Sequence, residues 1–319
     1  MDPVTHTLVG ATLARTGLDR RTPLAAATLM IAANAPDIDI ITAFGDRNAT
    51  LACRRGWTHG PVAWLLLPFV VAGCVMAWDR WVRRRRTPDA TPASAVVLLL
   101  LAIIGVLSHP ALDWLNTYGV RLLMPFTGQW FRGDSLVIID PYLWGALAVA
   151  LLGARVVRPD ILRARRIARV GGGAALTYVA LMIALSAAGE RLARTAAESR
   201  GISGIGEVLY SPRPASPLAA DLVVKTAEGY HFGSLRWLTN PRVTFDDQMV
   251  ALGDWNSGAV QRASADPAVR NYLVWSQFPY VRTEMTGTDT TVFFGDARYR
   301  GGMAGGLQGI RVALRPGAP

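Results

Sequence analysis

The chain has 319 residues and a net charge of +10, with 51% hydrophobic and 18% charged side chains. Soluble proteins carry about 25% charged residues, so the composition excludes an ordinary soluble enzyme and favours a membrane protein in contact with the lipid bilayer. The arginines gather at the ends of apolar runs, where positive charge sets membrane orientation, so no nucleic-acid partner is expected.

Two short elements open the chain. Asp2 followed by Pro3 is typical of a helix N-cap with proline at the first helical position, and predicts a helix ending at about Arg15. The uncharged run from Thr22 to Pro36 would reach roughly 22 Å as a helix, short of a bilayer core of about 30 Å. We therefore expect a half-spanning or tilted helix there.

Longer apolar runs follow. Three are long enough to cross a membrane and a fourth becomes so when residues 136–140 are added: Gly60–Trp78, Ala90–Leu112, Val170–Gly189 and Pro141–Ala154. Residues 1–189 are thus predicted to form an α-helical polytopic membrane domain of about five spanning or half-spanning helices. The expected location is a bacterial-type inner (plasma) membrane.

Arginine is concentrated in two segments, residues 80–86 and 155–169. By the positive-inside rule both segments are cytoplasmic. Tracing the helices from these anchors puts residues 37–39, 58–59 and 108–113 together at the outer face.

The chain changes character after residue 189, since glutamate is absent before Glu190 and recurs after it. We predict a linker over residues 190–217, which is rich in glycine, serine and proline in its second half, and a small β-rich extracytoplasmic domain over residues 218–319. Four strands are expected, at Asp221–Lys225, Tyr230–Leu238, Tyr272–Ser276 and Thr290–Phe294.

Two acidic motifs stand in apolar surroundings, where ionisable groups are costly and are therefore candidates for function. His109 and Asp113 are spaced i, i+4 and share one helical face. Asp37 and Asp39 would face the same way only in an extended chain, which the neighbouring Pro36 favours.

With His6 and His59, these residues form a mixed histidine and aspartate set that suits a divalent metal, zinc before manganese, with one or two ions. Simpler interpretations stay open. Asp2 fits a helix cap better than a ligand, His59 could cap a helix, and the His109 pair could be hydrogen-bonded without metal. For His231, a surface or packing role is expected.

Several segments resemble the YdjM-type predicted inner-membrane metal-dependent hydrolases, a group named in connection with LexA regulation. They lie within residues 1–145: Met1–His6, Pro36–Asp39, Arg55–His59 and His109–Gly119. Their order is also similar to zinc-dependent phospholipase C and P1-type nucleases. The resemblance implies one metal held by Asp37 or Asp39 together with His59, His109 and Asp113. It implies a second metal held by His6, with Asp113 shared between the two.

Polar neighbours of these motifs are expected to assist. Arg54 and Arg55 would hold phosphate oxygens, or remain solvated loop charges. Thr58 and Asn116 are expected to contact and orient the metal ligands without binding the metal themselves. Asp140 is expected either to do the same, to replace a ligand, or to lie in an outer loop.

The sequence therefore favours an enzyme, a metal-dependent hydrolase of a phosphoester, lipid-linked because the site would open at the outer membrane surface. Whichever of Asp37 and Asp39 is not a ligand would orient or deprotonate the attacking water. Two other classes stay open: an ion- or proton-coupled transporter using the same cluster, and a non-catalytic membrane protein stabilised by metal.

Overall fold

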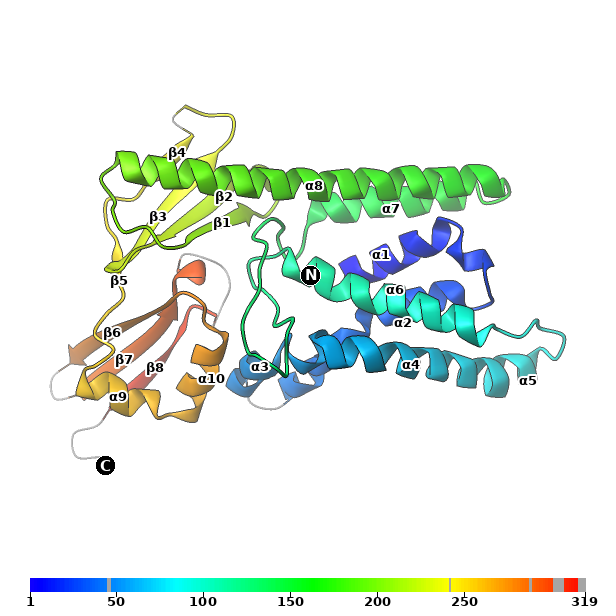
Figure 1. Ribbon diagram of the computed structural model, residues 1–319, viewed down its shortest axis with the longest axis horizontal. Coiled ribbons are helices and arrows are strands. Elements are labelled where there is room, and N and C mark those ends of the chain that lie inside the picture. Colours follow the sequence, from blue (N-terminus) through cyan, green and yellow to red (C-terminus); the bar gives the residue numbers. More distant parts are fainter. Residues whose placement is uncertain (45–46, 241, 287–288, 301–306, 315–319) are drawn as a thin grey trace. The chain divides into compact units, whose positions relative to one another are not determined.

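The computed structural model describes residues 1–319 except 45–46, 241, 287–288, 301–306 and 315–319. The chain forms two compact units (Figure 1). The helical unit consists of Met1–Asp39 and Arg55–Ala184, and the β-rich unit consists of Ile40–Arg54 and Leu185–Pro319.

The longer helices of the helical unit are, in chain order, α1 (Pro3–Arg15), α2 (Ala25–Asn34), α4 (Pro61–Trp78), α6 (Ala95–Trp114), α7 (Pro141–Val156) and α8 (Ile161–Ser199), the last of which runs on into the other unit. Among the described residues, three helices are long and apolar enough to cross a membrane: Pro61–Arg86, Ala95–Trp114 and Ile161–Ser199. Helix α7 is a shorter apolar helix. Three apolar helices of spanning length are thus present, while the number of about five spans stays a prediction.

Helix α1 begins and ends where the sequence predicts. The Asp2 carboxylate accepts hydrogen bonds from the backbone N–H groups of Val4 and Thr5, and Pro3 occupies the first helical position. Asp2 is therefore a helix cap, as expected, because it satisfies N–H groups that have no partner within the helix.

Helix α2 packs closely against α1 and α6 (Figure 1). A Cβ added to Gly10 of α1 would lie 2.8 Å from the Leu29 carbonyl oxygen of α2, and one added to Gly105 of α6 would lie 2.6 Å from the Cβ of Ala32. Small residues at these crossings let the helix backbones approach, as is usual in membrane bundles. The C-terminal end of α2 is thereby brought beside α6.

The extended conformation predicted around Asp37 and Asp39 is wrong. The chain leaves α2 directly into a 3₁₀ helix, η2 (Ala35–Phe44). Proline is tolerated in a first helical turn, where its missing N–H is not needed, so Pro36 does not force the chain to extend. With about three residues per turn, residues two apart point in different directions, and the two carboxylates diverge.

The β-rich unit contains two antiparallel sheets. The first has the order β1-β2-β3-β4, with β5 also pairing with β3, and the second has the order β6-β7-β8. The strands are β1 (Val208–Arg213), β2 (Ser216–Lys225), β3 (Gly229–Arg236), β4 (Val243–Phe245), β5 (Val250–Ala251), β6 (Pro279–Thr286), β7 (Asp289–Asp296) and β8 (Gly309–Leu314). Three predicted strands thus correspond to β2, β3 and β7.

The fourth predicted strand, Tyr272–Ser276, is wrong. Its residues end a helix, α10 (Pro267–Trp275), which follows α9 (Gly258–Ser264) and packs against α3 (Arg47–Cys53) of the same unit. Asp266 caps α10, and Val269, Tyr272 and Trp275 are its buried residues. Their spacing of three places them on one helical face, which outweighs the strand preference of the aromatic residues.

The predicted linker over residues 190–217 is also mostly structured. Helix α8 continues to Ser199 and β1 starts at Val208. Ala193 and Ala197 of α8 are fully buried against Tyr210 and Leu222 of the first sheet. The appearance of charged residues marks the end of the apolar run but not the end of the helix, because Ala, Glu, Leu and Arg are good helix formers.

A buried ion pair fastens α10 to the second sheet. Asp296 at the end of β7 has no exposure, and its Oδ2 lies 2.8 Å from Nη2 of Arg298 and accepts from the Ser276 hydroxyl at 2.8 Å. The Arg298 guanidinium also lies 4.8 Å from the ring centre of Trp275. Burial alone would raise the pKa of Asp296, but Arg298 and the hydrogen bonds lower it below its usual value.

We expect Arg298→Met to lower the free energy of unfolding by about 3–5 kcal/mol at neutral pH, because it leaves a buried carboxylate uncompensated. The pKa of Asp296 in the folded state lies below the unfolded value of about 3.9, so its interactions stabilise the wild type at pH values above about 3.9. This stabilisation is lost as the pH falls through the folded-state pKa. The difference between wild type and variant should therefore shrink towards acid pH.

Hydrogen exchange of peptides covering residues 275–298 in the full-length protein measures this difference. Arg282→Met is the matched control, since Arg282 is exposed and stacks on Tyr280, and should change stability by less than about 0.5 kcal/mol. A deficit that does not shrink between about pH 7 and a pH below the folded-state pKa of Asp296 would contradict the assignment.

Candidate metal centre

Four acidic and histidine side chains from three segments meet inside the helical unit. They are Asp37 of η2, His59 of the 3₁₀ turn η3 (Trp57–His59), and His109 and Asp113 of α6. One ligand atom from each lies within 4.8 Å of the others. The side chains of the last three are fully buried, and that of Asp37 is 11% exposed. The cluster thus has one slightly open edge, at Asp37.

Three of the four atoms have nearly the spacing of a tetrahedral ligand set, and the fourth lies slightly farther out. The Nε2 atoms of His59 and His109 are 3.1 Å apart, and Oδ2 of Asp113 lies 3.4 and 3.5 Å from them. Oδ1 of Asp37 lies 3.9 and 3.8 Å from the same two nitrogens. Zinc bonds of about 2.0–2.1 Å place tetrahedral ligand atoms about 3.3–3.4 Å apart. Two imidazoles and two carboxylates could therefore hold one divalent ion here.

Each histidine is held through its other ring nitrogen. Nδ1 of His109 lies 2.7 Å from the carbonyl oxygen of Ala33 in α2. A carbonyl can only accept, so this nitrogen carries the hydrogen and the Nε2 lone pair faces the cluster. Nδ1 of His59 lies 2.9 Å from the Thr58 hydroxyl. Metal-binding histidines are commonly oriented in this way.

Asp39 lies behind His59 and outside the group of four. Its Oδ2 is 3.6 Å from Nδ1 of His59, accepts the backbone N–H of Arg55 at 2.7 Å and accepts the Thr58 hydroxyl at 3.4 Å. The two acids of the motif therefore differ in position. The Asp37 carboxylate faces the cluster, whereas the Asp39 carboxylate holds the segment that carries His59 by accepting the Arg55 N–H.

Asp113 is the residue on which the cluster converges. Besides the two histidines, its carboxylate contacts Nε of Arg55 at 3.0 Å and the amino group of Met1. Arg55 is 3% exposed and donates to Oδ1 of Asn116 at 3.0 Å. A solvated loop position for Arg55 is thus wrong: its guanidinium supplies positive charge to a buried carboxylate, and Asn116 holds that guanidinium in place.

His6 stacks on His109, with ring centres 3.7 Å apart and planes 17° from parallel. It is fully buried, and in the described part of the structure neither ring nitrogen has a hydrogen-bond partner. Its Nε2 lies 3.4 Å from Oδ1 of Asp113, on the oxygen that the four-residue group does not use. Buried imidazoles are rarely left without partners, so this position needs an explanation.

Asp140 and Arg54, two expected participants, are not among the four residues of the cluster, and neither is His231, for which a surface or packing role is expected. Asp140 caps α7 by accepting from the N–H groups of Tyr142 and Leu143, and also accepts from the Tyr178 hydroxyl at 2.9 Å. Arg54 belongs to the β-rich unit, and His231 lies in β3 of that unit. The cap role of Asp140 has the same sequence signal as Asp2, an acid directly before proline. The Ala33 carbonyl has no sequence signal, because any residue supplies one.

The helical unit with this cluster defines the class: a membrane protein with a candidate metal centre. The chain belongs to the YdjM inner membrane protein family, whose model matches residues 1–192. The resemblance noted in the motifs is thus confirmed for the family and extends beyond residue 145, and every residue of the cluster lies within it. No curated protein and no solved structure matches the chain. The similarity to zinc-dependent phospholipases stays a prediction.

We expect detergent-purified protein to carry bound zinc or manganese, and the double variant His109→Ala/Asp113→Ala to lose it, because two of the four donors are removed. Elemental analysis of the purified proteins measures the metal per chain. His231→Ala is the matched control and should retain the wild-type content. Equal metal in the double variant and the wild type would contradict a site at this cluster.

Proposed function

We propose that this protein is a membrane-bound, metal-dependent hydrolase of a phosphoester, lipid-linked and reached from the outer membrane surface. The observation that carries the proposal is the gathering of four histidine and aspartate donor atoms within 4.8 Å of one another, with the Asp37 side chain 11% exposed and the other three fully buried. Four protein donors would fill a tetrahedral zinc ion, so a water or substrate oxygen would enter beside Asp37 as a fifth ligand or in place of its carboxylate.

A divalent ion at this place would polarise a phosphoryl oxygen and lower the pKa of a bound water to about 7. Asp37, on the open edge, would accept the proton of that water or position it for attack. Asp39 would hold His59 in the orientation that directs Nε2 inward, through its contacts with Nδ1 and with the Arg55 backbone.

Arg55 is proposed as a positioning residue and not as a phosphate ligand. Its donors go to Asp113, Asn116 and the Gly119 carbonyl, at 3.0, 3.0 and 3.2 Å. His6 is proposed to hold a second ion with Asp113 or to accept a proton during turnover. Its partnerless ring nitrogens beside the second carboxylate oxygen support this role.

The proposed topology puts the cluster outside. His59 precedes the N-terminal end of α4, while Arg83–Arg86 follow its C-terminal end, and 18 helical residues separate these points by about 27 Å. Positive charge favours the cytoplasmic side, so the opposite end of α4, with the cluster, would face outwards. The β-rich unit would then lie outside as well.

Single cysteines test this topology in a Cys53→Ser/Cys74→Ser background, which removes both natural cysteines. Impermeant maleimide should label Arg85→Cys and Arg163→Cys only from the inside, and Asp254→Cys only from the outside. All three positions are exposed in the structure. External labelling of Arg85→Cys would reverse the proposed placement.

The two acids of the motif distinguish the proposed hydrolase from a proton-coupled transporter. Asp37→Asn should lose both metal and turnover, since it removes a donor and the group at the open edge. Asp39→Asn should bind metal about 10- to 100-fold more weakly, the usual effect of losing a group that orients a ligand. Turnover of Asp39→Asn at saturating metal should exceed that of Asp37→Asn.

Metal titration and hydrolysis of a panel of phosphoesters, including lipid phosphates, measure these effects on the purified proteins. Proton flux in reconstituted vesicles is the parallel assay. Wild-type protein that binds no metal and hydrolyses no phosphoester, yet conducts protons through both acids, would contradict the proposal and favour a transporter.

A further inference from the structure

A second charged site lies at the other end of α1. The turn after α1 and the cytoplasm-assigned half of α8 enclose a mainly polar pocket of about 410 Å³. Helix α1 has 13 residues, so its two ends are roughly 20 Å apart, with His6 near one end and this pocket beyond the other. The pocket is therefore separate from the candidate metal centre.

Four arginines line this pocket: Arg20, Arg21, Arg165 and Arg169. No carboxylate lines it, and in the described part of the chain none of the four forms an ion pair. The nearby Asp19 is engaged by Arg15 at 3.2 Å. The pocket thus concentrates four positive charges with no carboxylate among its lining residues, while Asp19 lines an adjoining pocket together with Arg20 and Arg165.

The two arginines from α8 are arranged around the pocket floor. Arg169 donates from Nε to the Thr16 carbonyl at 3.0 Å, which fixes its guanidinium. Nε of Arg165 is buried and has no hydrogen-bond partner in the described structure. Both guanidinium groups lie over Gly17, where φ is +124° and no side chain covers the floor. No carboxylate lines the pocket beside these two guanidinium groups, so an anionic acceptor would have to come from a ligand.

We propose that this arginine pocket binds the phosphate group of an anionic ligand. Guanidinium groups match phosphate oxygens through paired N–H donors, which a single ammonium cannot do. Four charges favour a phosphomonoester or a diphosphate over a singly charged phosphodiester. An anionic lipid headgroup and a water-soluble phosphate compound share this chemistry.

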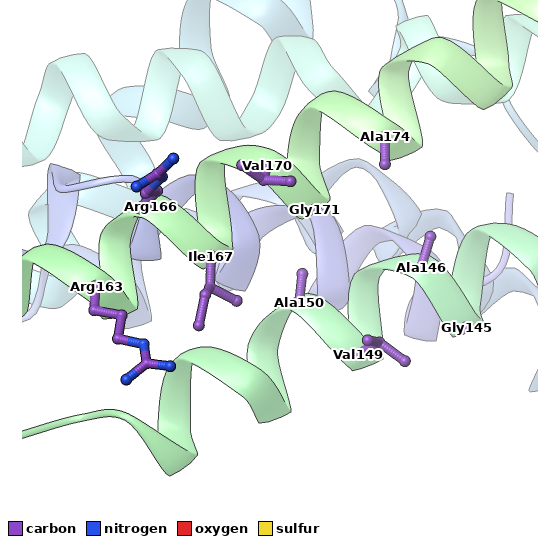
Figure 2. Close-up of a pocket in the computed structure, with 10 residues that line it drawn as sticks. All are labelled: Gly145, Ala146, Val149, Ala150, Arg163, Arg166, Ile167, Val170, Gly171 and Ala174. Atoms are coloured by element: carbon purple, nitrogen blue, oxygen red, sulfur yellow. The ribbon is translucent and has the colours of Figure 1, made fainter.

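The same helix supplies a matched control. On a different face of α8, Arg163 and Arg166 lie at one end of an apolar groove between α7 and α8 (Figure 2), where Gly171 packs against Ala150. Both arginines are exposed, as are Arg20, Arg21 and Arg169 of the arginine pocket. Replacing this pair removes the same charge from the same helix without touching the arginine pocket.

Full-length protein in non-ionic detergent is titrated with short-chain phosphatidic acid, inorganic pyrophosphate and short-chain phosphatidylcholine, at about 150 mM salt to screen non-specific attraction. The wild type and the control variant Arg163→Gln/Arg166→Gln should bind phosphatidic acid, pyrophosphate or both. Arg165→Gln/Arg169→Gln should bind them at least tenfold more weakly. Binding of phosphatidic acid alone identifies a lipid source, and binding of pyrophosphate alone identifies a soluble one.

Metal content at the separate centre reports whether each variant is folded. If the glutamine pair in the pocket misfolds, Arg165→Lys/Arg169→Lys replaces it, because this pair keeps the charge and loses the planar donor pairs. Equal loss in the pocket and control pairs, retained affinity in the pocket pair, equal binding of phosphatidylcholine, or no binding of either phosphate probe by wild type would each overturn the proposal.

Discussion

The helical unit is organised around one buried negative charge. Asp113 has no exposure, and a carboxylate in that position is costly unless positive groups and hydrogen-bond donors surround it. Arg55 provides one positive group at 3.0 Å, and three imidazoles from α1, η3 and α6 face the same carboxylate. A divalent ion between the imidazole nitrogens and the acids would provide the rest. Helix α1, the 3₁₀ turn η3 and helix α6 thus each bring a histidine to Asp113 at this end of the unit.

Close helix packing makes that convergence possible. Gly10 and Gly105 let α1 and α6 approach the backbone of α2, so that the Ala33 carbonyl at the end of α2 lies within 2.7 Å of Nδ1 of His109. The chain then turns into the 3₁₀ helix η2 instead of continuing as an α-helix. Irregular backbone is tolerated in membrane proteins where it is buried in protein or lines a polar site, and η2 carries Asp37 to such a site.

Local signals predicted the parts of the fold that depend on local chemistry. The acid-proline pair gave the start of α1, and the i, i+4 spacing gave the shared face of His109 and Asp113. The same acid-proline pair occurs at Asp266, before a run whose aromatic residues favour a strand. The cap predicts the observed helix α10 correctly there, and the aromatic content does not. The burial of Arg55 and the Ala33 contact could not be predicted, because both depend on how distant helices pack. The divergence of Asp37 from Asp39 was missed for a local reason, because the chain forms the 3₁₀ helix η2 where an extended chain was expected.

The separate role of Asp39 follows from the path of the chain. Residues 40–54 leave the helical unit, form part of the β-rich unit through α3 and α10, and return at Arg55. The hydrogen bond from the Arg55 N–H to Asp39, at 2.7 Å, joins the two ends of this excursion. This hydrogen bond closes the base of the loop. It thereby fixes the position of Asp37, two residues before Asp39, relative to His59, four residues after Arg55. The excursion can therefore belong to another unit while the ligand geometry is kept, and Asp39 preserves the cluster without being one of its four donors.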